Sequence, residues 1–199
     1  MDLEGYYQQQ SLKFFIKMNP NKVSRKLSLV LRHDPSAIDI QLDENGWTDV
    51  SILLNKLSDR GLTISMDLLE KVVRENDKQR FSFNEDKTKI RANQGHSIQV
   101  DLGMELQVPP ETLYHGTASR FIDSIQSSGL EKRNRQHVHL SEERETATKV
   151  GQRHGRPVIL LVAAKTMHEA GHQFYLSQNG VWLTDSVPTD FIINLNDPS

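Results

Sequence analysis

The chain has 199 residues, of which 36% are hydrophobic and 25% are charged, as is typical of a soluble globular protein with one large or two small domains. It has a formal net charge of −2 and no cysteine, which argues against a protein that coats nucleic acid through overall positive charge and excludes disulfides and cysteine-ligated zinc. The absence of cysteine also indicates a reducing, cytoplasmic location. No stretch approaches the roughly 20 apolar residues of a membrane span, and the first residues lack the pattern of a signal peptide, so we expect no membrane contact.

Positive charge is concentrated near the beginning of the chain. Between Ser11 and His33 there is no acidic residue. The basic residues of this stretch are Lys13, Lys17, Lys22, Arg25, Lys26 and Arg32. A local basic face on a nearly neutral protein suits a partner with a few well-placed phosphates better than nonspecific duplex binding.

Three segments of the first half have the periodicity of amphipathic helices. Their apolar residues recur over residues 23–31, 50–57 and 68–73. The first helix is expected to end at His33, because a proline follows two residues later. Residues able to cap the second and third helices are Thr48 or Asp49, and Ser65.

A β-hairpin is predicted after the third helix. Residues 80–83 alternate as a strand, 84–86 form a turn, and 88–92 pair back. Three short helices followed by a hairpin is the order of a winged helix, a module that commonly sits on nucleic acid, although the fold alone does not establish this function.

The pattern changes after residue 93. Residues 93–110 are polar and contain Gly103 and a proline pair, which is typical of a linker. We therefore predict two domains, 1–102 and 103–199, with residues 1–18 as an unassigned tail.

The second domain is predicted to be mostly sheet. Strands are expected at 112–115, 137–140, 158–164, 174–176, 181–184 and 191–195. Helical segments are expected from 121 to near Gly129, at 142–150 with Ser141 as its cap, and as a turn at 165–170. The fold class is therefore α+β.

The loop from Gly129 to Ser141 carries a concentration of chemically useful side chains. Its cations are Lys132, Arg133 and Arg135, and its imidazoles are His137 and His139, which alternate along a predicted strand. Either this loop holds an anion, or it is a solvated basic loop that leads into an ordinary strand. A zinc site needs three or four ligands, and no motif adds a third to the histidine pair, so we expect no metal.

Three further residues allow two readings each. Arg32 and His33 at a helix end are explained by the helix dipole alone, and Arg80 by an ordinary surface position. Their convergence would be a tertiary property that spacing alone does not reveal.

Five segments, in order, resemble the signatures of the NAD-dependent RNA 2′-phosphotransferases. These are Val-Ser-Arg-Lys-Leu-Ser-Leu-Val-Leu-Arg-His at 23–33, Asp-Glu-Asn-Gly-Trp at 43–47, Glu-Asn-Asp-Lys-Gln-Arg-Phe at 75–81, Leu-Tyr-His-Gly-Thr at 113–117 and Arg-Gln-His-Val-His-Leu-Ser at 135–141. The similarity extends over nearly the whole chain from residue 23.

The resemblance implies an N-terminal winged-helix lobe, a C-terminal ADP-ribosyltransferase-like lobe, and a substrate phosphate held between them. It implies a monomeric, cytoplasmic enzyme that transfers an internal 2′-phosphate of RNA, such as tRNA, to NAD without a metal. The catalytic quartet implied is Arg32, His33, Arg80 and Arg135. The implied NAD contacts are His115, Gly116, Thr117, Gly129, His139 and Ser141. In the loop, Arg135 is then the phosphate ligand, whereas Lys132 and Arg133 become solvated charges.

The chemistry of the residues agrees with this activity. A 2′-phosphate is already charged near neutral pH, so its attack on NAD needs no general base, and residues 178–184 contain no glutamate of the kind that toxin-like ADP-ribosyltransferases use. Arginine forks suit the stabilisation of phosphoryl charge. Two alternatives remain: an ADP-ribosyltransferase that stops after the first step, on a nucleic-acid end or a protein, and a noncatalytic RNA-binding module.

Overall fold

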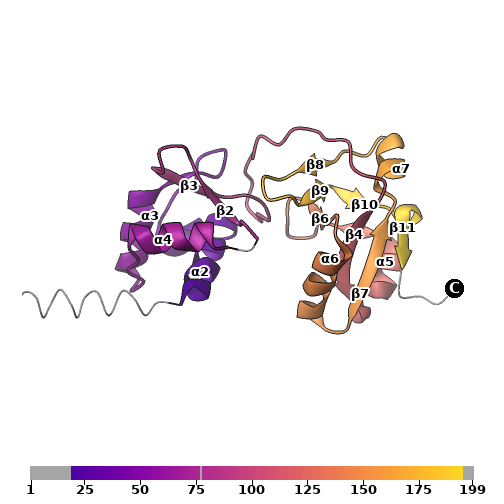
Figure 1. The fold of residues 1–199 in the computed structure, drawn as a ribbon, viewed down its shortest axis with the longest axis horizontal. Coiled ribbons are helices and arrows are strands. Elements are labelled where there is room, and N and C mark those ends of the chain that lie inside the picture. The colour runs from indigo at the N-terminus through magenta and orange to yellow at the C-terminus, as the bar shows by residue number, and fades with distance from the viewer. Residues whose placement is uncertain (1–18, 77, 195–199) are drawn as a thin grey trace, which may run out of the picture. The chain divides into compact units, whose positions relative to one another are not determined.

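A computed structural model of the protein describes residues 19–76 and 78–194 (Figure 1). It divides into two compact units, Met1–Leu102 and Gly103–Ser199. Each unit combines helices with small antiparallel sheets, so the predicted α+β class is confirmed. The predicted tail 1–18, Asp77 in the predicted turn, and Leu195 at the end of the last predicted strand lie outside the described residues.

The first unit contains the three predicted helices and a small sheet. The helices are α2 (Pro20–Arg32), α3 (Val50–Asp59) and α4 (Met66–Arg74), with a short 3-10 helix η1 (Pro35–Ile38); the strands are β1 (Thr48–Asp49), β2 (Phe81–Phe83) and β3 (Lys89–Ala92). The sheet order is β1-β3-β2, and all pairs are antiparallel. The predicted hairpin is therefore confirmed, with β1 as an additional third strand.

Side chains at the helix ends explain where these helices begin. The Oδ1 atom of Asp49 accepts hydrogen bonds from the amides of Ser51 and Ile52 at 2.8 and 3.0 Å, so Asp49 rather than Thr48 caps α3. Ser65 caps α4 by accepting from the amide of Leu68 at 3.2 Å. Each cap satisfies backbone donors that have no partner inside the helix.

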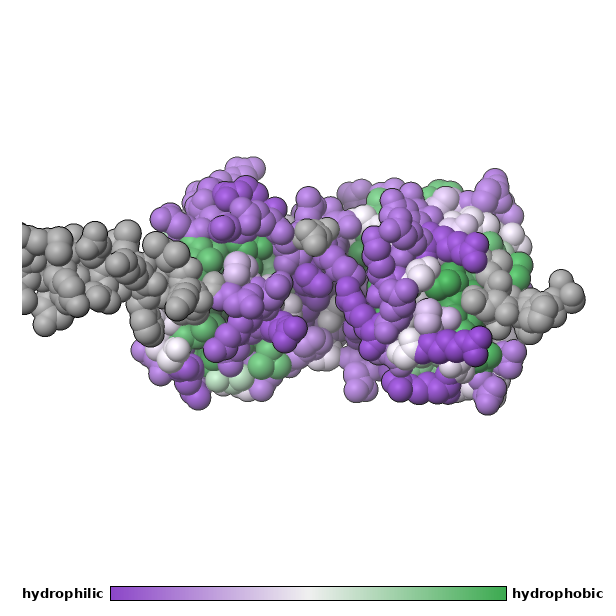
Figure 2. All heavy atoms as spheres, turned by 60° about the horizontal axis from the view of Figure 1, so that its bottom comes forward, coloured by the Kyte–Doolittle hydropathy of each residue, from purple (hydrophilic) through white to green (hydrophobic). Residues whose placement is uncertain are grey.

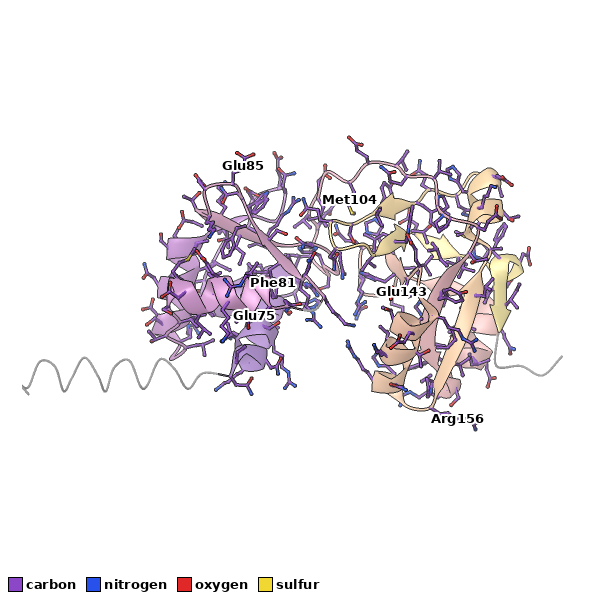
Figure 3. All side chains as sticks on the ribbon, viewed as in Figure 1. Glu75, Phe81, Glu85, Met104, Glu143 and Arg156 are labelled. Atoms are coloured by element: carbon purple, nitrogen blue, oxygen red, sulfur yellow. The ribbon has the colours of Figure 1, made fainter. Side chains whose placement is uncertain are left out.

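The core of the first unit consists of the apolar stripes of these helices closed by the sheet. Leu27, Leu31, Leu53 and Leu69 have no exposed surface, and Phe81 of β2 is 2% exposed. Phe81 is labelled in Figure 3, beside the helices of this unit. Removing such side chains from water is the main stabilising contribution to a domain of this size.

The second unit is built from three small sheets and several short helices. Its strands are β4 (Leu113–Ala118), β5 (Leu130–Glu131), β6 (Val138–Leu140), β7 (Pro157–Val162), β8 (Tyr175–Leu176), β9 (Trp182–Thr184), β10 (Ser186–Val187) and β11 (Ile192–Asn194). Its helices are α5 (Ile122–Ser128), α6 (Arg144–Gly151), α7 (Ala164–Glu169) and the 3-10 turns η2 (Ser119–Phe121), η3 (Gln152–His154) and η4 (Thr189–Phe191). The sheet orders are β11-β7-β4, β6-β9-β8 and β10-β5.

The central strand of the first of these sheets is β7. Its apolar run is expected for a strand with neighbours on both edges, and it pairs antiparallel with β4 and β11. Figure 1 shows β4 and β7 side by side with α6 next to them. Gly116 allows this packing, because a Cβ there would lie 1.7 Å from the carbonyl oxygen of Ala147 in α6.

Two expectations from the sequence are wrong. Ser141 does not cap α6: the helix begins at Arg144 after Glu143, labelled in Figure 3, which makes no side-chain cap bond. Residues 93–102 are part of the first unit rather than a free linker, since His96 is 0% exposed and the amide of Asp101 donates to the Glu44 carbonyl at 2.7 Å. Polar composition predicted exposure here, but tertiary contacts bury these groups.

The surface seen in Figure 2 is mostly hydrophilic, with small separate hydrophobic areas. Among the described residues, no helix is both long and apolar enough to cross a membrane.

Candidate active site

Arg32 and His33 lie together where α2 ends. Arg32 is the last helical residue, and His33 is the C-cap, with its amide donating to the Leu29 carbonyl. The Arg32 carbonyl belongs to the last turn, whose carbonyls lack partners within a helix. It accepts instead from the amide of Ser97 at 2.9 Å, and Oγ of Ser97 lies 2.9 Å from Nδ1 of His33.

Arg80 joins this pair through its backbone. Nη2 of Arg32 donates to the Arg80 carbonyl at 3.2 Å, and the amide of Asn93 donates to the same oxygen at 2.9 Å. The Arg80 side chain is oriented by Asn76, whose Oδ1 accepts from Nη1 of Arg80 at 2.9 Å. Three members of the predicted quartet therefore gather in the first unit.

The turn before Arg80 is conformationally unusual. Gln79 has φ +39°, a left-handed conformation that is unfavourable for a residue with a side chain. Its amide donates to the Asn76 carbonyl at 2.7 Å, and its own carbonyl accepts from Nδ2 of Asn93 at 2.6 Å. Two asparagines thus hold the backbone that carries Arg80 in this conformation.

A second group of predicted site residues lies in the second unit, where β4 meets β6. Nη1 of Arg135 is 3.3 Å from Nδ1 of His139, and Nδ1 of His115 is 3.0 Å from the His139 carbonyl. Ser141 follows β6 and exchanges two backbone hydrogen bonds with Tyr114 of β4, at 2.7 and 2.9 Å. Arg135, His115, His139 and Ser141 are therefore neighbours.

These contacts determine which histidine nitrogens carry protons. A guanidinium has only donors, so Nδ1 of His139 must accept from Arg135, and the proton of neutral His139 is on Nε2. A carbonyl only accepts, so Nδ1 of His115 donates to the His139 backbone. Burial lowers the pKa of His115, with the charge of Arg135 adding to this effect, and therefore favours its neutral form with a free electron pair on Nε2.

The other two cations of the loop are engaged elsewhere. Nζ of Lys132 pairs with Oδ1 of Asp185 at 2.9 Å, and the Arg133 guanidinium carbon lies 5.8 Å from the centre of the Phe121 ring. In the part of the chain that the structure describes, Arg135 takes part in no ion pair. The three cations are thus not equivalent, and Arg135 is the one placed next to the histidines.

The remaining predicted NAD contacts have structural reasons of their own. Gly116 and Thr117 continue β4 from His115, and Thr117 is 6% exposed. Gly129 ends α5 with φ +76°, and a Cβ there would lie 2.2 Å from the Val187 carbonyl oxygen, so it lies against β10 rather than in the histidine cluster. Packing alone therefore explains both glycines.

Sequence reasoning missed Asn93, His96 and Ser97. Asn93 is 6% and His96 0% exposed, and both ring nitrogens of His96 are buried. Burial lowers the pKa of His96 to about 4, and the nearby charges of Arg32 and His33 act in the same direction. No periodicity marks these residues, so the sequence offers no signal for their burial.

Histidines and carboxylates are the side chains of this chain that would hold a metal ion. Among residues 19–76 and 78–194, no group of three or more such side chains is arranged to hold a metal ion. Both clusters contain arginine guanidinium groups, which are ligands for anions.

Comparison with known proteins identifies the family. A family profile described as "RNA 2'-phosphotransferase, Tpt1 / KptA family" matches residues 18–186. A protein of Flavobacterium johnsoniae named "Probable RNA 2'-phosphotransferase" is 54% identical over 178 residues, which cover 88% of this chain and 98% of that protein. A protein of the same name from Hahella chejuensis is 53% identical, over 85% of this chain and 91% of that protein. Another, from Fusobacterium nucleatum, is 51% identical, over 87% of this chain and 98% of that protein. The resemblance of the five segments is thereby confirmed, and the chain belongs to the Tpt1/KptA family of RNA 2′-phosphotransferases.

Proposed function

We propose that this enzyme removes an internal 2′-phosphate from RNA by transferring it to NAD. A phosphate oxygen attacks the anomeric carbon of the nicotinamide ribose and nicotinamide leaves. The ribose 2″-hydroxyl then attacks phosphorus, and the RNA 2′-oxygen leaves with the proton of that hydroxyl. The products are 2′-hydroxyl RNA, nicotinamide and ADP-ribose 1″,2″-cyclic phosphate. The observation that carries this proposal is the assembly of Arg32, His33 and Arg80 in a chain of this family.

The phosphate is assigned to four residues. The family motifs imply Arg32, His33 and Arg80, which belong to the first unit, and Arg135, which belongs to the second. Two of these guanidinium groups are already oriented by neutral partners: Arg32 donates to the Arg80 carbonyl, and Arg80 donates to the side-chain oxygen Oδ1 of Asn76. Donors that are ordered before the reaction stabilise phosphoryl charge without further reorganisation, and each such group contributes a few kcal/mol at the transition state, by analogy with an oxyanion-hole donor.

The first unit is assigned to the RNA. Its three helices and small sheet suit a winged helix, and the predicted basic face continues into α2, where Lys22, Arg25 and Lys26 precede the site residues. Phosphate contacts of this kind position an RNA strand without reading its sequence.

The second unit is assigned to NAD, as an ADP-ribosyltransferase-like lobe. His115 offers an acceptor at Nε2 and the neighbouring Arg135 offers guanidinium donors, a combination that matches a ribose, whose hydroxyls both donate and accept. Gly116, Thr117, Gly129 and Ser141 complete the assignment that the family motifs imply. NAD supplies the reactive anomeric carbon, and the residues of the chain bind and orient it.

Proton transfer requires little of the protein in the first step, because the 2′-phosphate is ionised already. The absence of a glutamate from residues 178–184, which lead into β9, fits this acceptor. In the second step His33 is the one member of the quartet able to exchange a proton near neutral pH, and we assign it this role in addition to phosphate binding.

The decisive experiment uses a short oligonucleotide with one internal 2′-phosphate. Incubated with the protein and NAD, it is expected to lose the phosphate while nicotinamide and the cyclic phosphate appear, as resolved by mass spectrometry. Omitting NAD, or substituting a 2′-hydroxyl oligonucleotide, is expected to give neither product. Arg32→Gln is expected to remove the activity, whereas Arg60→Gln, which changes an exposed arginine paired with Asp39, serves as the matched control.

Other outcomes would identify the alternatives. A stable ADP-ribosylated RNA or protein without cyclic product would show an enzyme that stops after the first step. RNA binding that does not depend on NAD, with no product at all, would show a binding module. Either result contradicts the proposed reaction.

A further inference from the structure

Asn76 connects the side chain of Arg80 to the first helix of the chain. It follows Glu75, which ends α4 and is labelled in Figure 3. Its Oδ1 accepts from Nη1 of Arg80 at 2.9 Å and from the amide of Lys78 at 3.2 Å, and its Nδ2 donates to Oγ of Ser24 at 3.1 Å. Both polar atoms of the Asn76 side chain are therefore engaged with the protein.

The direction of the Asn76 amide is determined by the partners of its oxygen. A guanidinium and a backbone N–H can only donate, so the atom that faces Arg80 and Lys78 must be the oxygen. The amide nitrogen then faces Ser24, whose hydroxyl accepts from it. The orientation follows from two groups that cannot accept, and the Ser24 hydroxyl adapts to it.

The segment from Asn76 to Arg80 is attached to α2 through both of its end residues. Asn76 contacts Ser24 in α2, and the Arg80 carbonyl accepts at 3.2 Å from Nη2 of Arg32, the last residue of the same helix. Within the segment, the amide of Gln79 donates to the Asn76 carbonyl at 2.7 Å. The two arginines of the proposed phosphate site are thus held by one framework, in which Asn76 supplies a contact to the Arg80 side chain.

We infer that Asn76 is a positioning residue, which orients the Arg80 guanidinium for the 2′-phosphate without adding a negative charge beside it. A carboxylate at this position would accept a stronger hydrogen bond, but it would also compete with the phosphate for the guanidinium. The neutral amide orients the cation without reducing its attraction for an anion. This role rests on the proposed binding of the phosphate by Arg80, and it does not require Asn76 to be the sole contact of that side chain.

The first test measures binding without NAD, so that it does not depend on turnover. The short oligonucleotide is compared with and without its 2′-phosphate, and the ratio of the two affinities gives the contribution of that phosphate, because the backbone phosphates are common to both. Asn76→Ala, which removes the acceptor, and Asn76→Asp, which keeps the acceptor but adds a charge, are each expected to lower this ratio roughly ten-fold.

Asn84→Asp is the matched control. Asn84 also accepts from a backbone amide, that of Lys89 at 2.8 Å, and donates to a hydroxyl, that of Thr88 at 3.1 Å, and these contacts involve no arginine. The variant adds the same charge to the same unit and is expected to keep the wild-type ratio.

The second test separates positioning from a general structural role. In urea unfolding, Asn76→Asp is expected to be at least as stable as the wild type, because the charged acceptor strengthens the contact with Arg80 and the Ser24 hydroxyl can turn to donate to it. In the Arg80→Gln background, Asn76→Ala is expected to leave the affinity ratio unchanged, because the group through which Asn76 acts is absent.

The inference would be overturned by a wild-type ratio in Asn76→Asp, or by an Asn76→Ala loss of the same size in the Arg80→Gln background. A loss of stability in Asn76→Asp that accompanies its loss of affinity would also overturn it, since Asn76 would then only support the fold. A wild type that does not prefer the 2′-phosphorylated oligonucleotide would refute the phosphate assignment and this inference together. A wild type that prefers it but does not react with NAD would refute only the proposed reaction, and the affinity ratios would still decide the role of Asn76.

Discussion

Burial of His96 is expected to make the stability of the first unit depend on pH. Burial is the main cause that lowers its pKa to about 4, and the positive charges of Arg32, His33 and Arg91 add to it. In the unfolded chain the pKa is expected to be near 6.5. Between these two values the unfolded chain binds a proton that the folded protein does not bind, so the free energy of unfolding decreases as the pH falls below about 6.5 and levels off below about 4.

The size of this effect follows from the two pKa values. Their difference corresponds to a maximum loss of roughly 3 kcal/mol, of which about 1 kcal/mol is lost at pH 5.5 and roughly 2 to 3 kcal/mol at pH 4.5. His96→Phe removes the titrating group and keeps a ring of similar size. It also removes the contact of the ring with the Leu31 backbone, which is the smallest of the influences on the pKa of His96. Between pH 7 and pH 4.5 the free energy of unfolding of the variant is therefore expected to fall by roughly 2 to 3 kcal/mol less than that of the wild type.

The assay is urea unfolding followed by tryptophan fluorescence. Trp182→Phe is introduced in both proteins, so that Trp47, half-buried in the first unit, is the reporter. Comparing the two proteins at each pH cancels the contribution of all other ionisable groups. If His96→Phe and the wild type lose the same free energy of unfolding between pH 7 and pH 4.5, the buried neutral imidazole is not the cause.

Three further substitutions test packing, chemistry and surface charge separately. Gly116→Ala places a Cβ 1.7 Å from the Ala147 carbonyl oxygen, and we expect it to destabilise the second unit by at least about 2 kcal/mol in thermal unfolding; an unchanged melting temperature would contradict this packing. Arg80→Lys keeps the charge but loses the guanidinium fork, and we expect roughly a 100-fold slower single-turnover release of phosphate, with Arg60→Lys at the wild-type rate. Lys132→Ala breaks an exposed ion pair and should change neither the free energy of unfolding in urea nor the activity. A large loss of activity would show that Lys132 takes part in the reaction.

The regular elements were predictable because their patterns are local. The apolar stripe of α2 and the apolar run of β7 are visible in the sequence, and both elements form where predicted. The strands β1, β5 and β10 were not predicted, because each has two residues and depends on a partner distant in sequence. A pairing of this kind leaves no periodic signal.

The sequence motifs name the residues of the proposed site but not the contacts that hold them in place. The motifs name Arg32 and Arg80, but the contact between them is made by the backbone carbonyl of Arg80. Every residue carries such a carbonyl, so the sequence gives no sign of this contact. The burial of Asn93 and His96 was not predicted, because the polar composition of their segment is typical of a linker. Buried polar groups of this kind are specified by tertiary partners, which a single sequence does not display.

The loop that carries Arg135 is short and attached at both ends. Its six residues, 132–137, connect β5, which pairs with β10, to β6, which pairs with β9. Lys132 and Arg133 add contacts to Asp185 and Phe121 near its beginning. Most of the conformational entropy of this loop is therefore lost when the second unit folds. If Arg135 binds the phosphate as proposed, little further ordering of the loop opposes binding, and more of the contact free energy contributes to affinity.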